Sequence, residues 1–151
     1  MNTQQAFPSV KKQSKLNSEG YRDMTAADAL NNIAREDNMK RDHPLVYICS
    51  PFAGDTTRNT LHAQRYCRYA LGEGAIPLAP HLHYPQFLDD EDPEQRRLGR
   101  FCAHVLLGRC DALWVFGSHF SKGMTAEIDR AKKRGMPIRY LNDICAEVPS
   151  K

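Results

Sequence analysis

Four short apolar runs, separated by segments with helical spacing, constrain the fold of this chain more than any other feature. Each run is rich in residues that favour strands. The runs are LVYIC (45–49), AIPLA (75–79), DALWVFG (111–117) and PIRYL (137–141). Between them, apolar residues recur at helical intervals over 58–74, 93–110 and 123–135. Strands that alternate with helices predict an α/β fold, and we expect a single domain with a three-layer, doubly wound parallel sheet of four or five strands, flavodoxin-like or Rossmann-like.

The same pattern sets the expected domain boundaries. Residues 1–20 are polar and lack periodicity, which is typical of a disordered extension. Residues 21–43 carry a helical pattern after Thr25, a residue type that caps helices, and we interpret them as an accessory helix and linker. We expect the α/β domain over residues 44–143 and a C-terminal tail over residues 144–151.

Composition excludes several classes of function. The chain has 151 residues, 41% hydrophobic and 26% charged, as in globular proteins. Its net charge of +3 comes without a long run of like charges, so we expect no nucleic-acid partner, whereas anionic small molecules remain suitable ligands. No segment approaches the ~18 apolar residues of a membrane span, and the first residues lack an apolar signal core, so we expect a cytoplasmic protein. The five cysteines form no C-x-x-C pair and are expected to be reduced thiols.

Three polar loops follow the carboxyl ends of the first three predicted strands. They are SPFAGDTTRN (50–59), PHLHYPQFLDDED (80–92) and GSHFSKG (117–123). Ligands of doubly wound sheets bind in the crevice outside the carboxyl ends of the strands. The sequence therefore predicts a small-molecule site formed by these loops.

The segment SKGMTAEIDRA, which follows the third strand, places a carboxylate at the edge of the face that its helix buries. Ser121 is positioned to cap the helix or to donate to an oxyanion, and Gly123 lets a ligand approach the backbone closely. Glu127 lies about one turn inside, on the flank that faces the strand ends. A partly buried carboxylate beside a helix N-terminus remains charged, which suits a nucleophile.

Each of these residues also has a purely structural interpretation. Glu127 is equally explained as a glutamate favoured by the helix dipole and paired with Arg130 or Lys132. Asp111, at the start of the third strand, is explained as a cap or turn residue, and Tyr47 as part of the core. Periodicity alone leaves these alternatives open.

Three motifs together resemble the nucleoside 2-deoxyribosyltransferase superfamily. YICSPF (47–52) resembles its opening strand and turn, and DALWVFG (111–117) its strand that begins with aspartate and ends with glycine. SKGMTAE (121–127), the most specific of the three, resembles the turn and helix that carry the nucleophilic glutamate. The resemblance covers residues 45–141. The chain is also similar to a branch of uncharacterised bacterial and phage proteins that share its APH…Y..FLDD and SKGM..EI features.

The resemblance implies catalytic roles for three residues. Glu127 matches the nucleophile that attacks the anomeric carbon of the sugar and forms a glycosyl-enzyme ester. Asp111 matches the carboxylate that helps to protonate the leaving base. Tyr47 and Phe52 match aromatic residues near the sugar and the base.

The resemblance and the loop positions also imply a set of substrate-binding residues. The set is Ser50, Phe52, Gly54, Arg58, His81, Gly117, Ser121, Gly123 and Met124. Most transferases of the superfamily have aspartate at the position of Ser121, whereas its nucleoside 5′-monophosphate N-glycosidases have a serine that helps to hold the phosphate. The glycosidases' G-S-I-R-G-G turn is replaced here by CSPFAGDTTRN, where Arg58 is a hypothetical substitute cation.

We therefore expect N-glycosidic bond cleavage or transfer on a nucleoside or nucleoside 5′-monophosphate, without a cofactor. Water as acceptor makes the enzyme a hydrolase, and a second base makes it a transferase. One alternative is a non-catalytic nucleotide-sensing module with the same crevice, and another is an interaction protein that uses its N-terminal helix. The resemblance implies a homodimer or a larger homo-oligomer.

Two further groups of charged or metal-binding residue types have simpler interpretations. His81 and His83 could share a metal, but His119 is only an inferred third ligand and metal sites usually have three or four, so no metal is expected. His81 is instead placed in the crevice. The acidic run 89–92 is interpreted as a solvated loop that caps the helix beginning at Pro93. Arg96, Arg97 and Arg100 of that helix are expected to form a solvated face, from which one arginine can reach the crevice.

Overall fold

The computed structural model describes residue 19 and residues 25–150, and its contacts divide the chain into a unit that ends at His43 and a unit that begins at Pro44.

Local sequence signals determine where the N-terminal helix begins. In the first unit, helix α1 (Ala26–Asp42) follows Thr25, whose hydroxyl accepts from the Asp28 backbone N–H at 3.2 Å. The predicted cap is thus confirmed. The extension predicted over residues 1–20 lies, apart from Glu19, outside the described residues.

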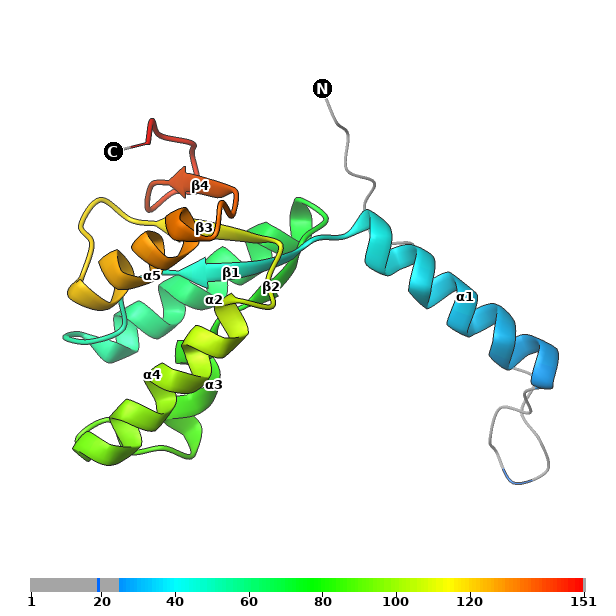
Figure 1. Ribbon diagram of the computed structural model, residues 1–151, viewed down its shortest axis with the longest axis horizontal. Coiled ribbons are helices and arrows are strands. Elements are labelled where there is room, and N and C mark those ends of the chain that lie inside the picture. Colours follow the sequence, from blue (N-terminus) through cyan, green and yellow to red (C-terminus); the bar gives the residue numbers. More distant parts are fainter. Residues whose placement is uncertain (1–18, 20–24, 151) are drawn as a thin grey trace. The chain divides into compact units, whose positions relative to one another are not determined.

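The second unit alternates strands and helices as the apolar runs predict (Figure 1). Its elements are β1 (Leu45–Cys49), α2 (Thr56–Gly72), β2 (Ile76–Leu78), α3 (Pro80–His83), the 3-10 helix η1 (Tyr84–Gln86), α4 (Pro93–Leu107), β3 (Ala112–Phe116), α5 (Lys122–Lys133) and β4 (Ile138–Leu141). None of the helices that the structure describes is long and apolar enough to cross a membrane.

The strands form one parallel sheet in the order β2-β1-β3-β4. Tyr47 of β1 is aligned with Leu78 of β2 on one side and with Leu113 of β3 on the other. The chain moves outward from β1 in one direction to reach β2 and in the other to reach β3 and β4. This order is that of flavodoxin-like folds, which confirms the predicted fold class. Its switch point lies between β1 and β3, where such sheets bind ligands.

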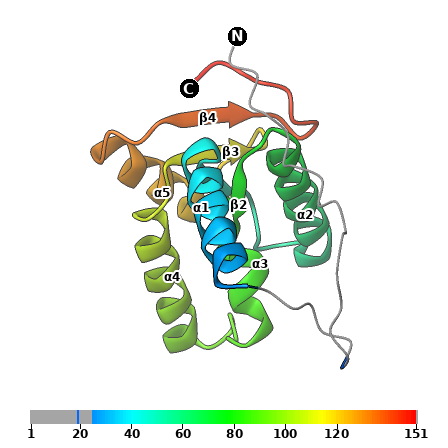
Figure 2. The ribbon, with the colours of Figure 1, turned by 90° about the vertical axis from the view of Figure 1, so that its right-hand side faces the viewer.

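Alternating side chains of the central strand divide the core into two layers. Val46 and Ile48 of β1 pack in a cluster with Tyr66 and Ala70 of α2. Residues 47 and 49 pack on the opposite face, in a cluster that includes Leu107 of α4 and Met124, Ile128 and Ala131 of α5. Figure 2 accordingly shows α2 on one side of the strands and α4 and α5 on the other. Burial of each large side chain of these layers contributes about 1.5–3 kcal/mol.

The loop predicted after the second strand is partly helical. Pro80 occupies the first turn of α3, where its fixed φ favours a helix and its missing N–H costs nothing. The amide of Gln86 donates to the Leu82 carbonyl at 2.7 Å and joins the end of η1 to α3. Helices of three or four residues are too short to show periodicity, which is why the sequence pattern indicated only a loop.

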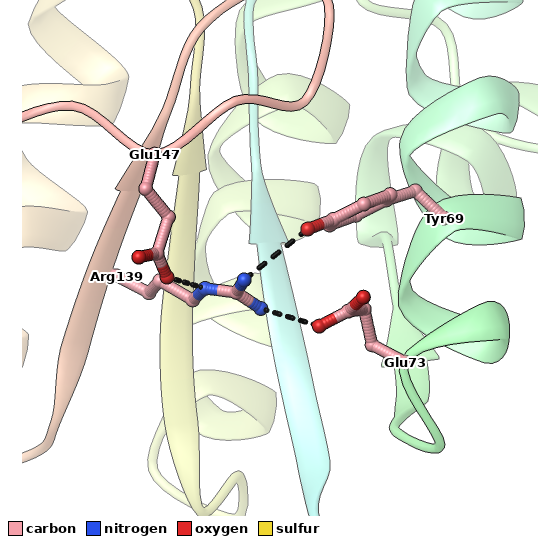
Figure 3. A network of polar contacts seen from close by, with 4 residues as sticks. All are labelled: Tyr69, Glu73, Arg139 and Glu147. Atoms are coloured by element: carbon pink, nitrogen blue, oxygen red, sulfur yellow. Dashed lines mark hydrogen bonds and ion pairs between the residues drawn. The ribbon is translucent and has the colours of Figure 1, made fainter. Parts of the chain in front are cut away.

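The chain after β4 folds back along it and is held by Arg139. The backbone N–H of Val148 donates to the Tyr140 carbonyl at 3.0 Å. The Arg139 guanidinium bonds to Glu147, lies 3.4 Å from the Glu73 carboxylate and 3.2 Å from the Tyr69 hydroxyl (Figure 3). It also lies over the Trp114 ring at 4.6 Å. One side chain therefore joins β4, α2 and the C-terminal segment.

We predict that Arg139→Ala lowers the free energy of unfolding by about 1–2 kcal/mol, because it removes cation–π contacts to two rings, Trp114 and Tyr69, and partly exposed ion pairs. Arg139→Lys should recover part of this loss, since an ammonium keeps the charge but lacks the planar fork. Urea denaturation measures both variants, with Arg68→Ala, an exposed arginine of α2, as the control. Equal stabilities for Arg139→Ala and Arg68→Ala would contradict the assigned role.

Candidate functional site

A cavity of about 350 Å³ lies at the carboxyl end of the sheet. Its walls come from the turn after β1, from α3, from one side of α4 and from the first turns of α5. Eight of the predicted site residues line it: Tyr47, Ser50, Phe52, His81, Ser121, Gly123, Met124 and Glu127. The size is within the ~300–1,000 Å³ range of small-molecule sites.

The position of Glu127 follows from the way in which α5 packs. Ser121 caps this helix by accepting from the Met124 backbone N–H at 3.2 Å. Met124, Ile128 and Ala131 are buried against the sheet and fix the rotation of the helix about its axis. Glu127 therefore lies at the edge of the buried face, partly buried, with its carboxylate on the cavity wall.

The Glu127 carboxylate is bonded to side chains of the central strand. Tyr47 donates its hydroxyl proton to Glu127 Oε1 at 2.6 Å, and the Cys49 thiol is a second hydrogen-bond donor. Among the ion pairs of the described residues, none joins Glu127 to Arg130 or Lys132, so the alternative pairing is not observed. Its hydrogen bonds thus point to a carboxylate held in the cavity, not at the helix surface.

Burial controls the protonation of this group. It raises the pKa of Glu127 above its ordinary value, and the hydrogen bonds from Tyr47 and Cys49 offset part of that rise. Burial, together with the nearby Glu127 charge, raises the pKa of the Tyr47 hydroxyl and of the Cys49 thiol well above their ordinary values. Tyr47 and Cys49 therefore remain protonated donors, and Glu127 is the group in this cluster that titrates.

Ser50 and His81 form a second polar cluster in the cavity. Ser50 directly follows β1, and its Oγ lies 2.9 Å from Nε2 of His81 at the start of α3. Burial lowers the pKa of His81 to about 4, so its imidazole is neutral at pH 7. The Phe52 ring stands at a tilt beside this imidazole, with 6.3 Å between the ring centroids.

Helix α4 and the acidic loop before it supply charged groups to the cavity. Arg96 and Arg100, four residues apart, both line the cavity, whereas Arg97 does not. Asp89 and Asp90 also line it, and Arg96 Nε lies 3.9 Å from an oxygen of Asp90. All three arginines are exposed, as expected for a solvated face, and two of them, where one was expected, also reach the cavity. The i, i+4 spacing of the two arginines was the signal that one helix face carries both.

Asp92 behaves as predicted at the start of α4. Its carboxylate accepts from the backbone N–H groups of Glu94 at 2.9 Å and Gln95 at 3.4 Å. The Gln95 side-chain amide donates to the same carboxylate at 3.0 Å, and this hydrogen bond, with the two backbone ones, holds the pKa of Asp92 below its ordinary value. The acidic run thus contributes both a helix cap and two cavity residues.

Four predicted site residues do not line the cavity. Gly54 and Arg58 belong to the turn before α2 and its first turn, where the Arg58 backbone N–H bonds to Asp55 and the residue is exposed. Gly117 directly follows β3 and has φ of 104°, and a Cβ there would lie 3.4 Å from Asp143 Oδ1. The role of Gly117 is therefore to allow the positive φ of the turn that lies beside the C-terminal segment.

Asp111 lies at the opposite end of the sheet. Its Oδ2 accepts from the Leu45 backbone N–H at 2.7 Å, and its own N–H donates to the Leu45 carbonyl at 2.7 Å. Both residues mark the amino ends of their strands, whereas the cavity is at the carboxyl ends. A group there cannot protonate a base bound beside Glu127, so the structural interpretation of Asp111 as a turn residue replaces the catalytic one.

The three histidines weighed as metal ligands have different surroundings. The His83 ring packs edge-on against Tyr84 and Phe87, and His119 bonds to Ser118 at 3.0 Å. Over the described residues, no three His, Cys, Asp or Glu side chains gather as a metal site would require.

Comparison with known proteins relates the second unit to both a family and a fold. Residues 44–141 match the family model described as Domain of unknown function (DUF7768). No curated protein matches the chain. The solved structure of a 2-deoxyribosyltransferase from the psychrotolerant bacterium Bacillus psychrosaccharolyticus superposes with a TM-score of 0.52 at 16% sequence identity. The superposition covers 70% of this chain and 76% of that one, and at this identity it shows a common fold.

The raised pKa of Glu127 predicts a pH-dependent effect of Glu127→Gln on stability. Because the folded-state pKa exceeds the unfolded value, deprotonation above pH 4.5 costs the folded protein free energy, and this cost grows until pH passes the folded pKa. The glutamine variant lacks the titration. Its free energy of unfolding relative to wild type should therefore increase from pH 4.5 to pH 8, measured by urea denaturation.

Asp129→Asn on the exposed side of α5 is the matched control. A difference between wild type and Glu127→Gln that is constant over this pH range would show that Glu127 is not desolvated as described.

Proposed function

The chain belongs to the DUF7768 family of domains of unknown function, and we propose that its cavity cleaves the N-glycosidic bond of a nucleoside or nucleoside 5′-monophosphate. The observation that carries the proposal is the Glu127 carboxylate, held at 2.6 Å by the Tyr47 hydroxyl on the wall of a cavity of about 350 Å³. The fold shared with a 2-deoxyribosyltransferase supports the same class of chemistry.

In the first step, a Glu127 oxygen attacks C1′ of the bound pentose. The C1′–N bond breaks, its electron pair leaves with the base, and a glycosyl ester forms on Glu127. The hydrogen bond from Tyr47 fixes the orientation of the carboxylate and, by lowering its pKa, favours the charged form that attacks. The negative charge also stabilises the oxocarbenium-like transition state.

The departing base needs a proton, and two carboxyl groups other than Glu127 line the cavity. Asp89 and Asp90 come from the loop before α4 and take the role that the resemblance gave to Asp111. Phe52 and the neutral His81 imidazole offer flat faces on which a base or a pentose can pack.

The charged groups of α4 and α5 favour a substrate with a 5′-phosphate. Arg96, Arg100 and Lys122 line the cavity together with Ser121. Ser121 Oγ accepts from the Met124 N–H, so the hydroxyl proton of Ser121 is available to a phosphate oxygen. Arginine binds phosphate with its planar fork of N–H donors.

One observation supports a non-catalytic alternative, in which the cavity binds a nucleotide without cleaving it. The raised pKa of Glu127 favours its protonated form, which donates a hydrogen bond but does not attack carbon. Calorimetry followed by chromatography separates the two functions. A nucleotide that binds tightly and is recovered intact after prolonged incubation would support the sensor.

We predict that the protein releases free base from at least one of the common 2′-deoxynucleosides or their 5′-monophosphates, followed by chromatography. Glu127→Gln should lower the rate by about 10³-fold or more, because an amide neither attacks C1′ nor stabilises its positive charge. Asp129→Asn, on the same helix but exposed, should retain the wild-type rate. Asp111→Asn should also retain most activity, since its side chain bonds at the far end of the sheet.

We further predict an acidic limb in the pH dependence of kcat. The nucleophile must be deprotonated, and its pKa is raised, so kcat should rise with pH through a midpoint above 4.5. Tyr47→Phe removes a hydrogen bond that lowers this pKa, so its midpoint should lie at a higher pH than that of wild type. Tyr140→Phe, the same change in the same apolar layer, should leave the midpoint in place.

A further inference from the structure

The Ser50–His81 pair lies in the proposed active site but has no part in the attack by Glu127. Ser50 is buried, with 8% of its surface exposed, and its Oγ lies 2.9 Å from His81 Nε2. The two residues come from different elements, the end of β1 and the start of α3. Both line the cavity that Glu127 also lines.

The protonation state of His81 determines what this pair can do. A neutral imidazole whose proton is on Nδ1 presents Nε2 as an acceptor, and Nε2 then accepts the hydroxyl proton of Ser50. The lone pairs of Ser50 Oγ remain available to a molecule in the cavity. A water that donates to Ser50 Oγ is therefore connected through one hydroxyl to a group that can accept its proton.

Resting on the proposed function, we propose that Ser50 and His81 form a proton relay that activates water against the glycosyl ester, so that the protein is a hydrolase. The water oxygen bonds to C1′ while the C1′–Oε bond breaks, and the electron pair of that bond returns to the Glu127 carboxylate. The water proton passes to Ser50 Oγ as the Ser50 proton passes to His81 Nε2. The imidazolium then releases its proton to solvent, and free sugar leaves.

The chain contains a second Ser–His pair that serves as a matched control. Ser118 Oγ lies 3.0 Å from His119 Nδ1, a separation close to that of the cavity pair. Both of these residues are exposed, and neither lines the cavity. A change at His119 therefore tests whether loss of a serine–histidine contact alone affects turnover.

The test uses His81→Gln and Ser50→Ala, with His119→Gln as the control. The glutamine oxygen can accept the Ser50 hydroxyl proton in a hydrogen bond but cannot take up that proton at neutral pH. The substrate is the nucleoside or nucleotide of the panel above that wild type cleaves fastest. Free base and free sugar are followed separately by rapid quench, and the mass of the intact protein reports the sugar adduct.

We expect each cavity variant to release base in a burst of about one equivalent per site and then to turn over about 10²-fold or more slowly than wild type, the contribution typical of a general base. The sugar adduct on Glu127 should accumulate in both variants and be absent from His119→Gln. Thermal unfolding checks that the variants are folded. If His81→Gln does not fold, Ser50→Ala carries the test.

Three results would overturn the relay. The first is wild-type turnover in folded His81→Gln and Ser50→Ala. The second is an equal loss of the rate of the base-release burst and of the steady-state turnover rate, which indicates that the pair only shapes the cavity. The third is a wild-type protein that passes its sugar to an added base and releases no free sugar. Absence of base release by wild type would instead refute the proposed function, and the relay with it.

Discussion

The hydrogen bond from Tyr47 to Glu127 connects the two parts of the fold on which the site depends. It joins the central strand of the sheet to α5 across 80 residues of sequence. Strand pairing on both sides fixes the backbone of Tyr47, and its ring is buried in the core cluster beneath α5. Met124, Ile128 and Ala131 fix α5 against that sheet. The carboxylate is consequently oriented by backbone elements, and the precision of the site follows from strand pairing and core packing.

Burial gives the cavity residues their protonation states. The same exclusion of water that raises the pKa of Glu127 lowers the pKa of His81. Near neutral pH this leaves an imidazole able to accept a proton beside a carboxyl group whose negative form is less favoured than in water. Burial thus shifts the pKa values of two groups in one cavity in opposite directions. Acid–base assignments in enzymes often rest on such differences in pKa.

The sequence predicted the sheet well because the evidence for it is local. Each strand is a run of strand formers, and the helices between them show regular apolar spacing, which together lead to the parallel order. The position of Glu127 on the cavity wall likewise follows from helical spacing. Asp111 was misassigned because a motif match does not say which end of the strand the residue occupies. The first residue of a parallel strand lies at the amino end, far from the ligand crevice. The sequence predicted that one arginine of α4 reaches the crevice, but no local pattern tells which of Arg96, Arg97 and Arg100 face it.

The C-terminal segment has a consequence for the sheet as a whole. An outermost strand presents unpaired N–H and C=O groups, which invite pairing with another chain and aggregation. Along β4, the Val148 N–H donates a hydrogen bond to the Tyr140 carbonyl, and residue 147 forms an antiparallel bridge with Leu141. At the other edge, β2 spans three residues and contains Pro77, which has no N–H to offer. Neither edge offers a long template for intermolecular strand addition, so Arg139, by holding the segment in place, also protects the protein against edge-to-edge association.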